Sequence, residues 1–413
     1  MELFKKFFDL QVFVNHVNVT TDNTVGNDLS PEMKTYYDMT LLDEAAPNLV
    51  HDQFGQKKPI PSGSGKTIEF RKFSSLAKAL TPLTEGVTPD GKTLNVTAIT
   101  ATVSQYGDYI TQSDVLELTA LDNTIIEATK LLGKQAGVTL DTVTRDILQA
   151  GTNVSYASTW SGSTETEVST RAGLNSTAKL KVDTIERAVA KFKANNVPTI
   201  NGDYVCIIHP YVAYDLRRDP DWLDAHKYAQ PEELYTGEIG KIAGVRFVTS
   251  SEAKVYYGAN LASNSRTLTV NGTSSSTTVT FDGGTVAEHA LINRYIIIDG
   301  ARRKVTDNTA TTITVDSAVS ATDDHVIYPG EGAGDGSCVF GCLLVGDGAY
   351  GVTEVTGGGL QTIVKQKGSA GTADPLDQRS SIGWKAIKTA EILVPENLLR
   401  IECCSRYTAI AEN

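Results

Sequence analysis

Apolar residues recur at helical spacing over one long stretch of the chain. They follow one another at intervals of three or four residues, with a mean of about 3.6, and so lie on one helix face: Leu118, Leu121, Ile125, Ala128, Leu132, Ala136, Leu140, Val143 and Ile147. Thr111 or Ser113 can cap the start and Gly151 the end, which predicts a single helix of about 38 residues, a rod of about 57 Å. Gly133 and Gly137 inside it each disfavour a helix by about 1 kcal/mol and indicate close packing or a bend.

Alternating apolar and polar residues predict a long hairpin before this helix. The strand TIEFRKF at 67–73 is followed by a turn-rich segment that includes Pro89-Asp90-Gly91. The chain then returns over 94–110, where the alternation changes phase at Ile99, as it does at a β-bulge. A lone hairpin is marginally stable in water, so we expect this one to pack against another subunit.

The segments after the long helix alternate between helical and strand patterns. Asp183 and Glu186 have capping-box spacing at the start of a predicted helix that ends before Pro198. A strand at 204–208 and a short helix at 210–218 follow, and this alternation predicts a compact mixed α/β domain. Residues 1–55 show no sustained periodicity, and we predict an extended arm with a short helix over 31–46.

The character of the chain changes over 257–331. Threonine, serine, asparagine and glycine become frequent, and short alternating runs are separated by turn pairs such as Asn271-Gly272 and Asp299-Gly300. This segment predicts a small all-β unit, a barrel or sandwich of five or six strands, inserted into the preceding domain with boundaries good to about five residues. No internal repeat of fixed period accompanies it.

Charge and hydropathy restrict the class of protein. The 413 residues include 37 Lys and Arg against 49 Asp and Glu, so the formal net charge is −12. A chain this acidic repels polyanions at long range, which disfavours specific recognition of nucleic acid. No run of about 18 apolar residues is present, and Asp9 and Gln11 interrupt the amino-terminal apolar stretch, so we expect neither a secretion signal nor a membrane span.

Two glycine-rich motifs are similar to nucleotide-binding loops but lack their context. Gly65-Lys66-Thr67 ends like a phosphate-binding loop, yet the position of its first glycine is Ile60, and a strand pattern follows. The stretch from Gly346 to Gly351 fits GxGxxG after an apolar strand, but the next residues favour a strand and cannot open a helix. We interpret the first as a loop before a strand and the second as a tight turn between two strands.

The remaining reactive side chains form no catalytic or metal-binding pattern. None of the six histidines pairs with another at helical spacing: His16, His51, His209, His226, His289 and His325. We interpret Asp323-Asp324-His325 as a solvated loop and Arg302-Arg303-Lys304 as a solvated strand face. The five cysteines are interpreted as reduced and buried thiols: Cys206, Cys338, Cys342, Cys403 and Cys404. The sequence therefore predicts no enzyme, no catalytic residue, no cofactor and no metal site.

Five segments resemble a known family. They are LTEGVTPDGKTL (83–94), QYGDYITQSDV (105–115), HPYVAYDLRRDPDW (209–222), GEIGKIAGVRFVTSSEAKV (237–255) and GSAGTADPLDQRSSIGWKA (368–386). Together with the order of elements, they resemble a major capsid protein of a tailed bacteriophage with the Hong Kong 97 type fold, and more narrowly the major capsid family of the N-four phage. The resemblance covers most of 35–410 and excludes the β-rich insert.

The resemblance implies an α+β fold divided into the parts of that capsid protein. These are an amino-terminal arm (1–55), an extended hairpin or E-loop (56–110), a peripheral domain with the spine helix (111–198), the first part of an axial domain (199–256), the inserted β-rich domain (257–331), the second part of the axial domain (332–360) and the return strands of the peripheral domain (361–413). Because the hairpin begins within about seventy residues, we expect any scaffolding protein to be a separate chain and no amino-terminal propeptide to be removed.

The function that the resemblance implies is structural. The chain would assemble with itself into pentamers and hexamers that form the icosahedral shell around double-stranded phage DNA, within the virion and after synthesis in the host bacterial cytoplasm. Implied partners are a portal protein at one vertex, a separate scaffolding protein, a decoration protein on the insert and weakly held DNA, but no membrane. Two alternatives stay open: the shell of an encapsulin-like nanocompartment, and a surface adhesin.

Overall fold

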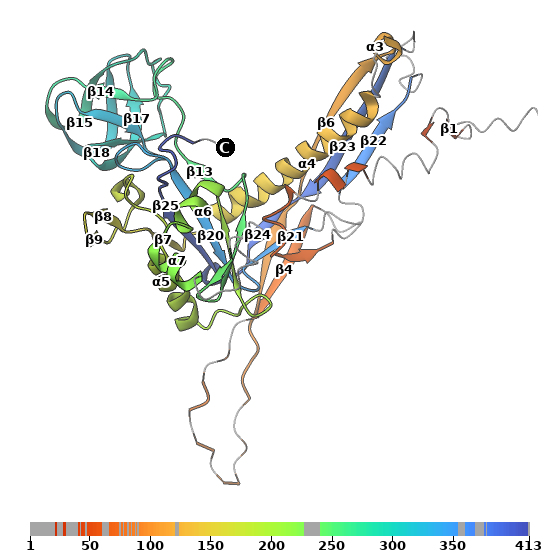
Figure 1. The fold of residues 1–413 in the computed structure, drawn as a ribbon, viewed down its shortest axis with the longest axis horizontal. Coiled ribbons are helices and arrows are strands. Elements are labelled where there is room, and N and C mark those ends of the chain that lie inside the picture. Colours follow the sequence, from red (N-terminus) through yellow and green to blue (C-terminus); the bar gives the residue numbers. More distant parts are fainter. Residues whose placement is uncertain are drawn as a thin grey trace, which may run out of the picture.

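The computed structural model describes six main ranges of the chain and two short strands before them. It covers residues 40–59, 66–119, 124–226, 240–353, 360–367 and 376–411, except for residues 42, 46–47, 74–75, 77, 81, 84, 87, 89–90 and 377, and it adds the short paired strands β1 (Thr21–Asp22) and β2 (Asp28–Leu29). The chain forms a central body from which a long arm, a barrel and an extended loop project in three directions (Figure 1).

The central body is built on a seven-stranded mixed sheet. Its order is β11 (Lys241–Ile242), β12 (Val245–Thr249), β10 (Tyr204–Ile208), β20 (Val339–Val345), β25 (Leu398–Cys403) and β7 (Val154–Tyr156), with β13 (Val255–Tyr256) paired to β20. Every residue of β10 and β20 is buried, as continuous apolar runs such as Val339–Val345 predict. The helices beside the sheet are α5 (Val182–Ala194), α6 (Pro210–Leu216) and α7 (Pro220–His226), with a 3₁₀ turn at Arg171–Gly173. The predicted alternation of strand and helix is therefore confirmed here.

The long arm combines the predicted helix with a three-stranded antiparallel sheet. Helix α4 (Thr124–Gln149) packs against β22 (Leu360–Lys365), β23 (Arg379–Lys388) and β6 (Ser104–Ser113) (Figure 1). Leu132, Ala136 and Leu140 of the predicted apolar face contact Ile382 and Trp384 in one core. The helical periodicity therefore identified the correct buried face.

Of the two predicted caps of the long helix, Ser113 is confirmed and Thr111 is wrong. Residues 111–113 belong to β6, which pairs with β23 from Ser104↔Lys388 to Ser113↔Arg379. A separate short helix, α3 (Asp114–Thr119), precedes α4, and Ser113 caps it by accepting a hydrogen bond from the Leu116 N–H at 3.3 Å. At 26 residues, α4 is about 39 Å long.

The two glycines inside α4 allow a close backbone approach. A Cβ at Gly133 would lie 2.8 Å from the Leu41 carbonyl oxygen, and one at Gly137 would lie 2.5 Å from the Ala45 carbonyl oxygen. Leu41 and Ala45 belong to helical residues within the short helix predicted over 31–46. The close packing expected from these glycines is therefore present, between α4 and the amino-terminal arm.

The extended loop begins and ends in a two-stranded antiparallel ladder, β4 (Thr67–Phe73) with β5 (Val96–Thr102). The ladder runs without a register shift through Phe70↔Ile99, so the predicted bulge at Ile99 is wrong. The phase changes because Ile99 and Ala101 face a small core with Ile68 and Phe70, whereas apolar residues earlier in the segment remain exposed. The predicted return strand is also divided, since β6 pairs with β23 instead of β4.

A smaller sheet joins the amino-terminal arm to the body. It has the order β24 (Ala390–Ile392), β21 (Tyr350–Thr353) and β3 (Gln56–Lys58), with β3 parallel to β21. A short hairpin, β8 (Thr159–Ser161) with β9 (Thr164–Thr166), and a 3₁₀ turn at Pro395–Asn397 complete the described elements.

The predicted small all-β unit is a closed barrel of six strands. Its order is β14 (Leu268–Val270), β15 (Ser274–Asp282), β18 (Thr312–Ala321), β17 (Ala301–Asn308), β16 (Tyr295–Ile298) and β19 (Val326–Pro329). Asp299 and Gly300 both have positive φ, 46° and 75°, as a tight two-residue hairpin turn requires. The barrel encloses its own apolar core and projects from the body beside the carboxyl-terminal segment (Figure 1).

The sheet topology differs from the expected grouping of two segments. We expected 361–413 to form return strands beside the long helix, but β25 lies in the central sheet between β20 and β7. Helix α5, expected with the long helix, contributes Ile185, Val189 and Phe192 to the core of the central body. The central body therefore includes a strand and a helix from segments that the predicted boundaries assign to the peripheral domain.

Candidate functional site

The glycine-rich motifs both lead into strands. Thr67 is the first residue of β4, and Gly65 lies outside the described residues. The second motif forms the turn from β20 to β21, with Gly348 at φ +66°. Since neither motif is followed by a helix, neither has the geometry of a nucleotide-binding loop. The interpretation of Gly346–Gly351 as a tight turn is confirmed.

The histidines are dispersed through the fold. His51 is buried beneath α4, and His209 caps α6, where its Nδ1 accepts a hydrogen bond from the Tyr211 N–H at 3.2 Å. On the barrel, His289 Nδ1 lies 2.6 Å from the Asp307 carboxylate, and His325 contacts Asp299. His16 and the side chain of His226 lie outside the described residues. Among the described side chains, no three of His, Cys, Asp or Glu are grouped so that they could hold a metal ion.

The two charged clusters on the barrel are held by local contacts. Asp323 accepts a hydrogen bond from the Gly272 N–H at 2.7 Å, which closes the loop that contains Asp324 and His325. Arg302 on β17 stacks 3.8 Å from the Tyr295 ring and donates to the Gly330 carbonyl at 2.7 Å. These contacts explain both clusters as parts of the barrel structure.

All five cysteines are free and buried, as predicted. They line the core of the central body, where Cys342 Sγ and Cys403 Sγ lie 3.9 Å apart. Burial raises the pKa of Cys338 to about 11 and raises the pKa of Cys206 further. These thiols are therefore protonated at neutral pH and are poor nucleophiles. Separately, no helix in the described part of the chain combines the length and apolar character needed to cross a membrane.

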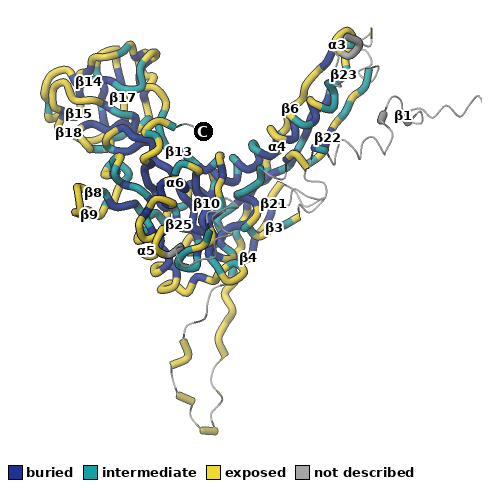
Figure 2. The backbone as a smooth tube through the Cα atoms, viewed as in Figure 1, coloured by how far each residue is buried: buried dark blue, intermediate teal, exposed yellow. Residues whose placement is uncertain are grey.

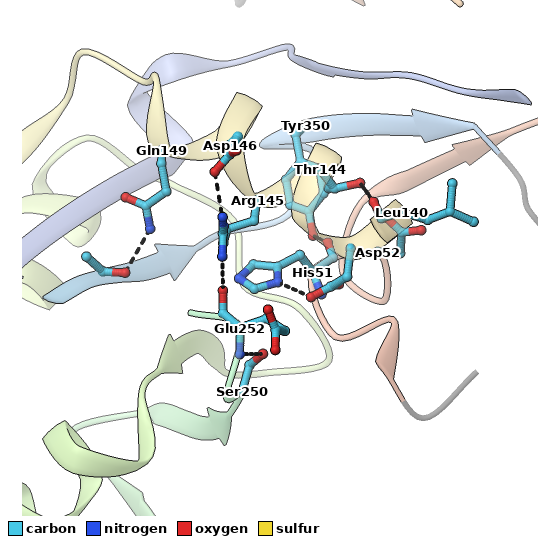
Figure 3. A network of polar contacts seen from close by, with 12 residues as sticks. His51, Asp52, Leu140, Thr144, Arg145, Asp146, Gln149, Ser250, Glu252 and Tyr350 are labelled. Carbon is cyan, nitrogen blue, oxygen red and sulfur yellow. Dashed lines mark hydrogen bonds and ion pairs between the residues drawn. The ribbon is translucent and has the colours of Figure 1, made fainter. Parts of the chain in front are cut away.

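A buried polar cluster fastens the amino-terminal arm to α4, and the sequence patterns did not reveal it (Figure 3). The Asp141 carboxylate accepts a hydrogen bond at 2.7 Å from the His51 backbone N–H and contacts His51 Nδ1 at 2.7 Å. The next residue, Asp52, accepts from Thr144 Oγ1 at 2.7 Å and pairs with the Lys388 ammonium of β23. Asp141 is 90 residues from His51 and Lys388 is 336 residues from Asp52, so local patterns could not identify either pair.

A second buried charge cluster joins the central sheet to the base of the barrel. Glu402 on β25 is fully buried, and the Arg171 guanidinium donates to both of its oxygens, at 2.7 Å from Nε to Oε2. The Arg400 Nε lies 2.8 Å from the same carboxylate, and Arg171 stacks 3.7 Å from the Tyr256 ring. Arg171 also donates to the Glu331 carbonyl, at the point where the chain leaves the barrel. The cluster is therefore a structural joint.

The described residues of the extended loop are largely exposed (Figure 2), and large apolar side chains are among them. On the extended loop, five large apolar side chains are exposed: Leu76, Leu80, Leu83, Leu94 and Val96. The most exposed are Leu80 at 82% and Leu83 at 77%. Scattered exposed leucines are normal, but a series of them on one slender projection marks an interaction site.

The face of the arm sheet that points away from α4 is also open. Side chains alternate across a sheet, so Ile382 and Trp384 face α4, while Gly383 and its cross-strand neighbours Tyr109 and Ile363 face outward. Tyr109 is 69% exposed. A groove of about 490 Å³ runs over this face, with Lys385 among its lining residues.

Comparisons with known proteins agree on one class. Residues 121–292 match the family model described as "Phage capsid protein". A search of curated proteins found no significant match.

Solved structures of phage capsids are similar in fold over most of the chain. The capsid of Cyanophage P-SCSP1u is similar with a TM-score of 0.50 and 14% identity, over 85% of this chain and 87% of that one. The capsid of Ralstonia phage GP4 has a TM-score of 0.50 and 13% identity, over 86% of both chains. The Cyanophage Pam1 capsid has a TM-score of 0.51 and 11% identity, over 88% of this chain and 92% of that one.

The fold is therefore that of the capsid shell proteins of tailed phages, the Hong Kong 97 type, as predicted. In sequence, residues 121–292 are similar to the phage capsid protein family, and in fold most of the chain is similar to these solved phage capsids. The narrower resemblance to the N-four phage family stays a prediction.

Proposed function

We propose that this protein assembles into pentamers and hexamers that form the icosahedral shell around double-stranded phage DNA. The observation that carries the proposal is the extended loop. Its leucines are exposed in the single chain, although the antiparallel ladder of β4 and β5 holds the two ends of the loop together. Apolar side chains without cover within the chain favour burial against another copy. The capsid fold provides the reason for many such copies.

The open face of the arm sheet is the proposed receiver for this loop. Tyr109 and Ile363 offer apolar contact, and the groove above Gly383 has room for side chains because glycine adds none. In this arrangement each subunit covers the apolar surface of one neighbour and is covered by another. Such a head-to-tail contact closes into rings, as capsomers require.

The test is assembly of the purified chain with charged substitutions in the loop. We expect the wild type to give capsomers or shells in negative-stain micrographs and light scattering. The double variant Leu80→Asp, Leu83→Asp should stay at the size of small oligomers, because burying two carboxylates in an apolar interface is strongly unfavourable. The matched control is Lys78→Gln in the same loop, which should assemble normally. Wild-type protein that stays monomeric at high concentration and moderate salt would overturn the proposal.

The domain assignment and the further partners expected from the sequence belong to the same proposal. The arm with α4 would be the peripheral domain and its spine helix, and the central body would be the axial domain. A portal protein at one vertex, a separate scaffolding protein, weakly held DNA and a decoration protein on the barrel are proposed partners, with assembly in the host cytoplasm. We propose a purely structural role without catalysis, since the capsid class explains the chain without one.

A further inference from the structure

The pair formed by Asp52 and Lys388 is an unusual environment for two ionisable groups. The Lys388 side chain is 0% exposed and that of Asp52 is 8% exposed, and Lys388 Nζ contacts Asp52 Oδ2 directly. Apolar clusters on both sides, which include Leu140 and Leu148 of α4, exclude water from the region. A buried ammonium–carboxylate pair gains little net stability because both charges have lost their hydration.

A covalent bond between the two groups would start from the neutral form of the pair. Transfer of one proton from the ammonium to the carboxylate leaves an amine beside a carboxylic acid, and no charge then remains to be solvated. Burial lowers the pKa of Lys388, although the Asp52 carboxylate opposes this effect. A desolvated lysine amine is a nucleophile of the kind that forms covalent bonds to carbonyl carbon.

The carboxyl group is also held in place for attack. Thr144 Oγ1 donates a hydrogen bond to Asp52 Oδ1 at 2.7 Å (Figure 3). The other carboxylate oxygen, Oδ2, contacts Lys388 Nζ. The hydroxyl is itself fixed, because it also bonds to the Leu140 carbonyl within α4. This hydrogen bond polarises the carbonyl and stabilises negative charge on Oδ1 when Nζ approaches Cγ.

A second carboxylate stabilises the positive charge that develops on the nitrogen. Asp141 is fully buried, and its negative charge acts on Lys388 to raise the lysine pKa, so it lies within electrostatic range of Nζ. His51 holds Asp141 in place through two contacts of 2.7 Å. Asp141 is thus a positioning and electrostatic residue of the cluster.

From this geometry we propose that Asp52 and Lys388 become joined by an intrachain isopeptide bond. The Lys388 amine attacks Cγ of the Asp52 carboxylic acid, the Nζ–Cγ bond forms and the Cγ–Oδ2 bond breaks. Oδ2 leaves as water with its own proton and one proton from Nζ. The electron pair of the broken bond leaves with the oxygen, so nothing is oxidised or reduced and no cofactor is needed.

The bond would close a covalent loop from the amino-terminal arm to the end of β23. The arm is otherwise attached by noncovalent contacts, which include the strand β3, the contacts of His51 with Asp141 and the packing of Leu41 and Ala45 against α4. The crosslink would therefore prevent the arm from detaching under load or in denaturant. It concerns a single chain and does not depend on the proposed assembly.

The decisive measurement is the intact mass of the denatured full-length protein. We expect a mass about 18 Da below that of the sequence, the mass of the water lost when the amine displaces it. Tandem mass spectrometry of a tryptic digest should then show one branched peptide that contains Asp52 and Lys388, without cleavage after Lys388. In a denaturing gel the closed chain should migrate differently from an open one.

Two variants complete the test. Lys388→Arg keeps the positive charge but has no amine that can form this bond, so it should show the full sequence mass. Lys385→Arg, on the same strand, should retain the loss of mass. A wild-type chain of full mass would overturn the proposal whether or not the variants fold, and so would a loss of water mapped to other residues.

Discussion

At the scale of single residues, the structure has buried ionisable side chains in segments whose sequence patterns indicated only a helix or a loop. His51 and Asp52 lie in an arm without periodicity, yet both are buried and hold partners far along the chain. Such pairs cannot be recognised from spacing, because their members become neighbours only after the fold has formed. The buried cysteines and the turn at Gly346–Gly351 were predictable, since burial and turn chemistry are local properties.

His209 makes stability depend on pH in a defined direction. Burial lowers its pKa from 6.5 to about 4, and its Nδ1 must stay unprotonated to accept the Tyr211 N–H. The folded chain then binds fewer protons at this residue than the unfolded chain between these two pH values. Its contribution is complete above about pH 6.5 and is lost as the pH falls towards about 4.

The variant His209→Asn isolates this effect. Asparagine is a preferred helix cap that does not titrate, so the variant should be less stable at neutral pH through lost ring contacts with Phe340. Its thermal midpoint, however, should fall less than that of the wild type between about pH 6.5 and about pH 4. Equal decreases in the two proteins would show that His209 does not contribute.

At the scale of elements, the sequence predicted whether a segment is a helix or a strand, and which of its faces is buried. It predicted less well which elements pair with one another. The apolar face of α4 and the barrel strands β14, β15, β16 and β18 follow from periodicity. The sequence could not decide between Thr111 and Ser113 as the helix cap, because β6 reaches Ser113 by pairing with β23, more than 260 residues later. The predicted bulge at Ile99 was wrong because the alternation of apolar residues depends on which face of the β4–β5 ladder is buried within this chain. Exposed apolar positions that face another molecule produce the same pattern as a shift in register.

The barrel is an element that should be removable. Its core is closed on itself, and its two connections touch, since a Cβ at Gly258 would lie 2.5 Å from Pro329 Cβ. Replacement of residues 259–330 by a short Gly-Ser linker should therefore leave soluble protein that still forms capsomers. The thermal midpoint should fall, because Tyr257 loses the Arg266 guanidinium, which stacks 3.4 Å from its ring and donates to its carbonyl at 2.7 Å.

The complementary fragment, residues 259–330 alone, should show a cooperative unfolding transition by circular dichroism. A deletion variant that cannot assemble, although it is folded, would instead make the barrel part of the contact between subunits.

At the scale of the whole molecule, a shell must bring many copies with a net charge of −12 together. Their mutual repulsion opposes assembly, while the exposed leucines favour it. Salt weakens the first effect, because the Debye length falls from about 30 Å at 0.01 M to about 8 Å at 0.15 M ionic strength.

We therefore expect assembly, followed by light scattering, to begin at a lower protein concentration as ionic strength rises over this range. The double variant in the loop should not respond. Assembly that weakens with added salt would mean that ion pairs between subunits outweigh the repulsion.

The order of strands in the central sheet also governs how the chain acquires its structure during synthesis. Among the described strands, β7 pairs only with β25, which leaves the ribosome some 240 residues later. Until residues 398–403 emerge, β7 stays unpaired and one edge of β20 lies open. The body can therefore close only late in translation, and until then the growing chain carries open strand edges.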